Sequence, residues 1–371
     1  MDSIEVAPER CLGGKEMKAT TSTMLAVLVL GAIAGILTAS ATSGSFSSNE
    51  FIPVRTEQPL LNPYVGYAPD ARGTGYALPF SLVYMSATWR ELEPEIGEYD
   101  FEGVEQAGGF DKWAAQGKKI ILQIVLDNPG SLPHSDLPVW LYAATNGTGT
   151  AYDGSIGMGF SPDYADPVLM EAHRRLMTAL GERYNADPRI AFIVLGSLGH
   201  GGSWHVMQEL NLFLHFPPQV VTDVYVDHYL NAFPDKKLLM RRPFRIARKN
   251  GMGLYNDMFG NEEATVNQYL GRIEEGYTSE LNGESMPEMR NFWEKAPAGG
   301  ALANGTDGQD WLNADALQSI LAQARLTHVS WLGPNVPDVT EEAARIGAEK
   351  LRSIIGYRFS IRSESHVLFE R

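Results

Sequence analysis

Polar residues suited to chemistry follow several short apolar runs of the sequence. Two of them are carboxylates, Asp257 in "GLYNDMF" and Glu284 in "NGE". Cleavage of a glycosidic bond needs two carboxyl groups that face each other, one to protonate the leaving oxygen and one to attack or to activate water. We therefore predict Asp257 and Glu284 as a catalytic pair and a carbohydrate as the partner of the protein.

Further polar and aromatic residues after the same runs are predicted to contact the ligand. Flat aromatic rings beside the carboxylates would stack on sugar faces, although packing in the core is the alternative for each tryptophan. The predicted ligand-binding residues are Trp89, Arg90, Asp127, His200, Ser203, Trp204, His205, Arg241 and Asn256. The two histidines are five positions apart and lack the ligand pattern of a zinc site, so neither a metal nor another cofactor is predicted.

Apolar runs that alternate with amphipathic segments must position these residues. This alternation is typical of parallel strands joined by helices, and eight such units predict an α/β protein with a (β/α)8 barrel over residues 60–355. The active site of such a barrel lies at the carboxyl ends of the strands. An open doubly wound sheet is the alternative, but no glycine-rich dinucleotide turn follows the first run. The expected strands are 64–68, 81–87, 119–127, 190–197, 237–242, 253–259, a weak one at 279–284, and 327–332.

Two helices have recognisable starts. Asp166 before Pro167 predicts an N-cap and a first turn, and Thr340 predicts the cap of a second helix. The apolar stripe of that second helix is expected at Ala344, Ala348, Leu351 and Ile355.

The composition is that of a globular protein with a sizeable core. The chain has 371 residues, 44% of them apolar, and seven tryptophans. Its 45 acidic residues outnumber its 30 basic ones and no long basic run occurs, so a nucleic-acid partner is not expected. Composition leaves the oligomeric state open.

The first 41 residues resemble a targeting segment. Lysines precede the apolar run "MLAVLVLGAIAGIL" and small residues follow it, so residues 1–41 are predicted to be a signal peptide, with Met17 as a possible true start. We expect a secreted protein without stable membrane insertion after processing. An uncleaved membrane anchor is the alternative, although a membrane span needs roughly 20 apolar residues. Residues 42–59 are a predicted linker, and the sequons at Asn146 and Asn304 predict a glycoprotein.

Two resemblances extend this interpretation. The segment "ATWRELEPEIGEYDFEGVEQAGGFDKWAAQGKKIILQIVLDNPG" resembles the W-x-x-[IL]-E-P-x-x-G-x-Y-[DN]-F segment of (β/α)8 glycoside hydrolases of the β-galactosidase and cellulase type. In addition, "LNPYVGY", "LGSLGHGGSWH", "KKLLMRRP", "GLYNDMF", "NGE" and "IGYRF" are similar, in this order, to a group of secreted barrel proteins of largely uncharacterised function. The resemblance implies glycoside hydrolase activity and a β-sandwich after the barrel.

The C-terminal residues are too few for such a sandwich. Residues 356–371 are predicted to be a remnant of it, with an exposed tail after Phe359. Within that tail, Ile361, Val367 and Phe369 are not expected to be enclosed by the barrel.

The glycine-rich segment "GSLGHGGSWH" departs from the resembled pattern G-x-x-G-x-W-G-E-W-H, because Ser203 stands where a glutamate is implied. In the resembled hydrolases that glutamate is the acid/base and a glutamate at strand seven, here Glu284, is the nucleophile. Three interpretations stay open. His200 or His205 donates the proton; Asp257 is the acid opposite Glu284; or the barrel binds sugar without cleaving it.

Overall fold

The computed structural model describes residues 48–51, 61–206, 216–280, 282–303, 312–337, 339–357 and 364–367. The chain divides into two compact units, one from Pro53 to Ile361 and one formed by Met1–Ile52 with Arg362–Arg371. The larger unit contains the candidate site.

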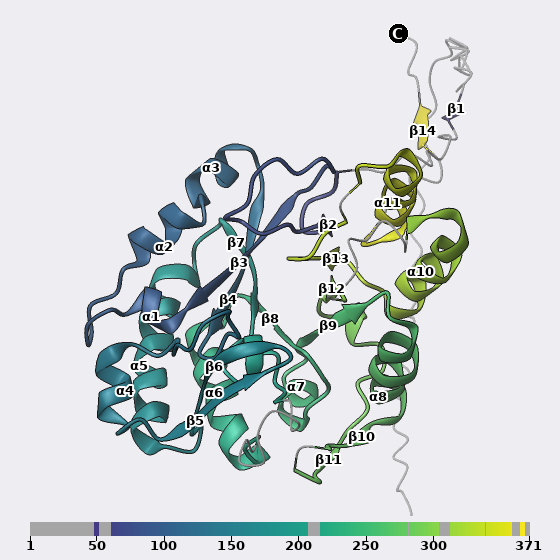
Figure 1. The fold of residues 1–371 in the computed structure, drawn as a ribbon. Helices are drawn as coiled ribbons and strands as arrows, with labels where there is room; N and C mark the ends of the chain where they lie inside the picture. Colours follow the sequence, from purple (N-terminus) through teal and green to yellow (C-terminus); the bar gives the residue numbers. More distant parts are fainter. Residues whose placement is uncertain are drawn as a thin grey trace, which may run out of the picture. The chain divides into compact units, whose positions relative to one another are not determined.

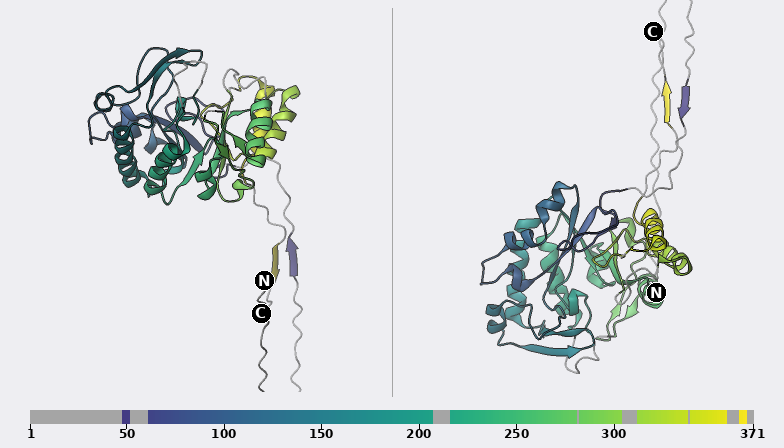
Figure 2. Two further views of the ribbon diagram at one scale, coloured as in Figure 1. Left: turned by 90° about the horizontal axis from the view of Figure 1, so that it is seen from below. Right: turned by 45° about the horizontal axis from the view of Figure 1, so that its top comes forward.

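Eight parallel strands form one sheet in the larger unit, with helices outside the strands (Figures 1 and 2). The strands are β2 (Gly66–Tyr67), β3 (Leu82–Thr88), β4 (Lys119–Val125), β7 (Ile190–Val194), β8 (Lys237–Met240), β9 (Gly253–Phe259), β12 (Ala298–Leu302) and β13 (Trp331–Leu332). They pair in the order β2-β13-β12-β9-β8-β7-β4-β3. The two end strands meet, because the amide of Tyr84 donates to Pro69 at 2.8 Å and its carbonyl accepts from Ala71 at 2.8 Å. The predicted (β/α)8 barrel is therefore confirmed, and the open sheet is wrong.

One predicted strand is wrong. Residues 279–284 lie between β10 (Tyr277–Thr278) and β11 (Ser285–Met286), which pair with each other antiparallel and not with the barrel. The seventh barrel strand is instead β12, "AGGAL". A Cβ atom on Gly299 would lie 2.1 Å from Cζ2 of Trp331, so this strand needs glycine where the ring packs. A glycine-rich strand carries little of the β-branched and aromatic signal by which strands are recognised.

The helices complete the barrel. They are α1 (Trp89–Leu92), α2 (Phe101–Ala107), α3 (Phe110–Ala115), α4 (Val139–Ala144), α5 (Pro167–Tyr184), α6 (Gln219–Ala232), α7 (Arg245–Lys249), a helical segment Glu263–Leu270 continued by α8 (Gly271–Glu275), α10 (Ala314–Thr327) and α11 (Glu342–Ile354). Short helical turns occupy His200–Gly202 and Phe292–Glu294. An antiparallel hairpin of β5 (Gly149–Gly154) and β6 (Gly157–Pro162) is inserted between α4 and α5.

One of the two predicted helix starts is confirmed. The carboxylate of Asp166 accepts hydrogen bonds from the amides of Val168 and Leu169, as an N-cap does. Thr340 is not the cap of α11, because the carbonyl of Glu341 accepts the first intrahelical bond, from Arg345 at 3.0 Å. The predicted apolar stripe of α11 is buried as expected: Ala344, Ala348, Leu351 and Ile355.

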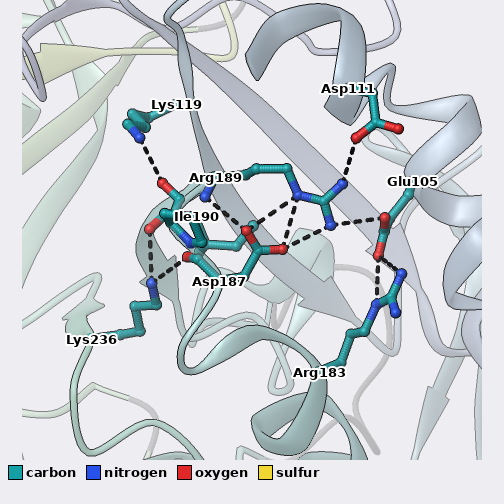
Figure 3. Close-up of polar contacts among 9 residues, drawn as sticks. Glu105, Asp111, Lys119, Arg183, Asp187, Arg189, Ile190 and Lys236 are labelled. Atoms are coloured by element: carbon teal, nitrogen blue, oxygen red, sulfur yellow. Dashed lines mark hydrogen bonds and ion pairs between the residues drawn. The ribbon is translucent and has the colours of Figure 1, made fainter. Parts of the chain in front are cut away.

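Charged side chains form a network of ion pairs and hydrogen bonds at the amino ends of the strands (Figure 3). Arg189, just before β7, donates to Asp187 at 2.7 Å, to Asp111 of α3 at 2.8 Å and to Glu105 of α2 at 2.8 Å. Lys236, just before β8, donates to the carbonyl of Asp187 at 2.7 Å. Residues at this end of a (β/α)8 barrel serve stability rather than ligand binding.

The smaller unit contains a two-stranded antiparallel sheet. Strand β1 (Ser48–Phe51) lies in the segment predicted as a linker, and β14 (Glu364–Val367) lies in the predicted sandwich remnant, with Ser48 opposite Val367. The predicted targeting segment 1–41, the sequon at Asn304 and the tail residues Phe359, Ile361 and Phe369 lie outside the described residues. Within the described ranges, no helix is long and apolar enough to cross a membrane.

Candidate active site

A pocket of about 560 Å³ opens at the carboxyl ends of the barrel strands. We call it the mouth pocket. Its wall includes Asn128 after β4, Ser203 after β7, Asp257 at the end of β9 and Asn335 after β13. Among the described residues, Asp257 is the single carboxylate that lines it. The combination of amide, hydroxyl, imidazole and charged groups with aromatic rings is typical of a ligand site.

A buried carboxylate supports a histidine in the wall of this pocket. Oδ2 of Asp127 lies 2.9 Å from Nδ1 of His200, and its Oδ1 accepts a 2.6 Å hydrogen bond from the hydroxyl of Tyr152 in β5. Asp127 is fully buried, whereas His200 reaches the mouth pocket. A carboxylate accepts hydrogen bonds, so Nδ1 of His200 carries a proton, and in the neutral imidazole Nε2 is then the acceptor. This Nε2 is buried and has no partner among the described residues.

A second polar group lies on β8 and β9. Nε of Arg241 is 2.7 Å from Oδ1 of Asp257, and both residues line the mouth pocket. His205, on the loop after β7, lines the same pocket. Burial first, and then the nearby guanidinium groups of Arg242 and Arg241, lower the pKa of His205 to about 3. His205 is therefore neutral at physiological pH and offers one nitrogen as an acceptor.

The glycine-rich segment is shaped by close backbone approach rather than by a ligand. Gly202 has a φ of 66°, and a Cβ atom there would lie 2.2 Å from the carbonyl oxygen of Gly196. Gly199 has a φ of 76° and would place a Cβ 2.4 Å from the carbonyl oxygen of His205. The loop thus folds back tightly on the end of β7, which only glycine permits. That fold presents His200, Ser203 and His205 to the pocket.

Trp204, predicted to contact the ligand, lies in the core instead. Its ring is fully buried, packs edge-on against Phe244 and donates from Nε1 to the carbonyl of Leu195 at 2.7 Å. Packing in the core was the alternative for each tryptophan, and it holds for Trp204.

Three other predicted contacts are also absent from the wall of the mouth pocket. Trp89 is fully buried and donates to Glu93 at 2.7 Å. Arg90 donates to the carbonyl of Leu137 at 3.2 Å, outside the pocket wall. Asn256 is buried and donates to Thr265 at 2.9 Å, because adjacent residues of a strand point to opposite faces and Asp257 takes the inner one.

Glu284 is not brought to the pocket that Asp257 lines. Its Oε2 accepts hydrogen bonds from the amide of Gln219 at 3.0 Å and from the side chain of Asn282 at 2.9 Å. Gln219 is the first residue of α6, so the carboxylate satisfies a free amide at the positive end of a helix. The resemblance implied that Glu284 is the nucleophile because residues 279–284 were expected to form the seventh barrel strand. Those residues do not form a barrel strand.

Several lining residues escaped the prediction because they sit within strands. Tyr84 and Ser86 are two positions apart on β3, and Tyr255 lies two positions before the predicted Asp257 on β9. Trp331 lines the pocket from β13. Side chains of a strand alternate between its faces, so this spacing could have identified them as inward-facing.

Within the described residues, no cluster of three or more His, Cys, Asp or Glu side chains could hold a metal ion.

Comparison with known proteins finds distant matches among solved structures. No protein-family model and no curated protein matches the chain. Matching solved structures include endo-glycoceramidase II from Rhodococcus sp. as a lactosyl-enzyme intermediate, at 14% identity over 79% of this chain and 70% of that one, with a TM-score of 0.40. A β-galactosidase from the psychrophilic Marinomonas ef1 matches at 14% identity over 73% and 55%, with a TM-score of 0.41.

A third match is the exo-β-1,4-mannosidase Op5Man5 from Opitutaceae bacterium strain TAV5, at 12% identity over 73% of this chain and 48% of that one, with a TM-score of 0.43. The chain thus spans about half the length of the mannosidase and of the β-galactosidase. The fold itself, a (β/α)8 barrel, is established by the strand order and the meeting of the two end strands. The chemistry of the protein depends on the site itself.

Proposed function

We propose that the mouth pocket binds a carbohydrate. The observation that carries the proposal is a set of four buried polar atoms that line or adjoin one pocket and have no hydrogen-bond partner among the described residues. They are Nε2 of His200, Nδ1 of His205, Nη1 of Arg241 and Nε1 of Trp331. Buried polar atoms in proteins are almost always hydrogen-bonded, so four exceptions around one pocket indicate a ligand rich in polar groups.

The mixture of donors and acceptors suits sugar hydroxyl groups. Nε1 of Trp331 and Nη1 of Arg241 are donors, whereas Nε2 of His200 is an acceptor in the tautomer favoured by Asp127. A hydroxyl group both donates and accepts, so neighbouring hydroxyls of one sugar ring can satisfy both kinds of atom. The rings of Tyr84 and Tyr255 add apolar wall for the faces of the sugar.

A glycan array followed by calorimetric titration tests this proposal. We expect at least one oligosaccharide to bind, and we expect Asn128→Ala and Trp331→Phe to weaken its binding by about fivefold to tenfold each, because each removes a hydrogen-bonding group. Trp293→Phe is the control, since Trp293 stacks on His328 near the amino ends of β12 and β13. The proposal fails if no glycan binds, or if the control weakens binding as much as the pocket variants do.

The Asp127–His200 pair favours hydrolysis as a second function. A histidine oriented by a carboxylate can transfer a proton, and Asp257 is a carboxylate in the same pocket that could attack or activate water. Under this mechanism His200 takes the part of the acid that the resembled hydrolases place at position 203. The pairing of Asp257 with Glu284 has no support in the arrangement of the side chains.

Reducing-end assays on the glycans that bind separate the two functions. If the barrel is a hydrolase, His200→Gln and Asp257→Asn each lower turnover by about 10²-fold to 10⁴-fold. Ser203→Glu restores a carboxyl group to the pocket wall and is expected to raise turnover, with a new pH-dependent limb. Absence of turnover in both the wild type and Ser203→Glu would exclude hydrolysis as a function and leave the proposal of carbohydrate binding unaffected.

A further inference from the structure

A small recess adjoins the mouth pocket and is lined by three arginines. Its volume is about 30 Å³, and Arg241, Arg242 and Arg272 lie in its wall together with Tyr269. Arg241 and Asp257 belong to both the recess and the mouth pocket. We call this space the arginine recess. Its volume is far below the 560 Å³ of the mouth pocket, so it has room for a small polar group and not for a sugar ring.

Positive charge exceeds negative charge around the arginine recess. Asp257 pairs with Arg241 at 2.7 Å, and Glu280 lies 3.7 Å from Arg272 but is largely exposed to solvent. Arg242 is only 8% exposed, and no described carboxylate lies within ion-pair distance of its guanidinium group. A buried guanidinium group without an anionic partner is costly, so its presence calls for a reason.

The electrostatic environment of Arg242 reflects this excess. Burial, followed by repulsion from Arg241 and Arg272, lowers the pKa of Arg242 to about 9. An anion placed between these groups would weaken the repulsion among the guanidinium groups and offset the cost of burying the charge of Arg242.

Two hydrogen-bond donors in the recess also have no partner. Nη1 of Arg241 and the hydroxyl of Tyr269 are buried, and neither is hydrogen-bonded to a described residue. Both can donate to the oxygen atoms of a carboxylate. Guanidinium groups present two parallel N–H bonds that match the two oxygens of a carboxylate, and such bonds are stronger than those between neutral groups.

We propose that the arginine recess binds a carboxylate group of the saccharide in the mouth pocket, so that the ligand contains a uronic acid. This inference rests on the proposed carbohydrate binding and narrows it to acidic saccharides. The excess of guanidinium groups and the two donors without a partner among the described residues favour an anionic substituent over a neutral hydroxymethyl group. The small volume and the residues shared with the mouth pocket fit a substituent of a sugar that is bound there.

Calorimetric titration of the whole protein with matched oligosaccharides tests the inference. Each pair consists of a uronate oligosaccharide and its carboxyl-reduced, neutral counterpart, for example oligogalacturonate with the corresponding galactose oligomer and oligomannuronate with the mannose oligomer. A sulfated oligosaccharide forms a third arm. We expect a uronate to bind at least about tenfold more tightly than its neutral counterpart, because charged hydrogen bonds are replaced by neutral ones on reduction.

Variants locate the effect in the recess. Arg242→Gln is expected to reduce uronate affinity to that of the neutral counterpart without changing the affinity of the latter, and Tyr269→Phe to reduce the preference in part. Arg345→Gln, an equal change of charge on the exposed face of α11, is the control and is expected to change neither affinity. If Arg242→Gln does not fold, the inference is still tested by the preference of the wild type for uronate over neutral sugar and by the effect of Tyr269→Phe on that preference.

The outcomes separate the inference from the proposed function. Equal binding of uronate and neutral sugar overturns the inference and leaves carbohydrate binding intact. Tighter binding of the sulfated sugar than of every uronate overturns the assignment to a carboxylate. Failure of every saccharide to bind overturns the proposed function itself.

Discussion

Nδ1 of His200, in the wall of the mouth pocket, lies 2.9 Å from Oδ2 of the fully buried Asp127. The contact joins the loop after β7 to the end of β4, and Tyr152 of the β5–β6 hairpin holds the other carboxylate oxygen. The carboxylate thereby orients the imidazole ring and favours the tautomer in which Nε2 is an acceptor.

Asp127→Asn is expected to reverse the role of Nε2. An asparagine amide can donate to Nδ1 of His200, which moves the imidazole proton to Nε2 and turns an acceptor into a donor. We expect saccharide affinity to fall by about tenfold with little change in fold. The ligand loses one hydrogen bond to Nε2, and its own donor then faces the N–H of that atom. Titration calorimetry measures the affinity, and ¹⁵N chemical shifts of the imidazole report the tautomer.

Tyr152→Phe is the matched control for that variant, since it removes a bond to Asp127 without changing the acceptor that faces His200. Its effect on affinity should be smaller. Unchanged affinity in Asp127→Asn would show that His200 does not contact the ligand.

Glu284→Ala is expected to leave saccharide binding and any turnover unchanged. The carboxylate caps α6 through the amide of Gln219, so its loss should lower the free energy of unfolding by about 1 kcal/mol, the usual worth of a helix cap. Urea unfolding and titration of the same preparation measure both quantities. A large loss of turnover at unchanged stability would return Glu284 to the catalytic machinery.

Gly299→Ala should disturb the mouth pocket through Trp331. The added Cβ would lie 2.1 Å from Cζ2 of that ring, so the ring or strand β12 must move, and we expect a loss of about 1–3 kcal/mol in stability together with weaker binding. Gly271→Ala is the control, because a Cβ there meets no atom within 4 Å. Thermal unfolding and titration compare the two. Native stability and affinity in Gly299→Ala would mean that the ring adapts without cost.

Acidification is expected to destabilise the barrel through two histidines between α5 and α6. Nδ1 of His173 lies 2.9 Å from Nδ1 of His228, and Nε2 of His173 lies 2.7 Å from Oγ of Ser197. Burial, and then the charge of His228, lowers the pKa of His173 well below 6.5. Burial, and then Arg174, lowers the pKa of His228.

The two lowered pKa values determine how stability changes with pH. Below the unfolded pKa of about 6.5 the unfolded chain binds more protons than the folded one, so the histidines' contribution to stability is complete above that pH and declines as the pH falls toward the lowered folded values. Each histidine can contribute a slope of up to about 1.4 kcal/mol per pH unit.

Urea unfolding between pH 7.5 and 5 measures this slope. His228→Gln should reduce it, because the side-chain amide can bond to His173 without titrating. Acid-sensitive carboxylates affect the wild type and the variant alike, so the difference between the two isolates the histidines. Equal slopes would show that the pair does not couple protonation to folding.

Local patterns in the sequence were sufficient for most of the barrel. Apolar runs between amphipathic segments predicted seven of the eight strands, because burial of a strand or helix face depends on residues close together in the chain. The same runs placed Asp257, His200, Ser203, His205 and Arg241 at strand ends, and all five line the mouth pocket.

The remaining features depend on contacts between segments that are distant in the chain. Strand β12 is glycine-rich because the ring of Trp331 from the next strand occupies the space of a side chain at Gly299, and no local signal records that. Likewise, Glu284 is a carboxylate in a loop until α6 places a free amide beside it, and Trp204 is an aromatic in a loop until Phe244 closes the core around it. Local patterns are enough to identify the buried faces of strands and helices, whereas packing across the barrel determines which polar groups meet.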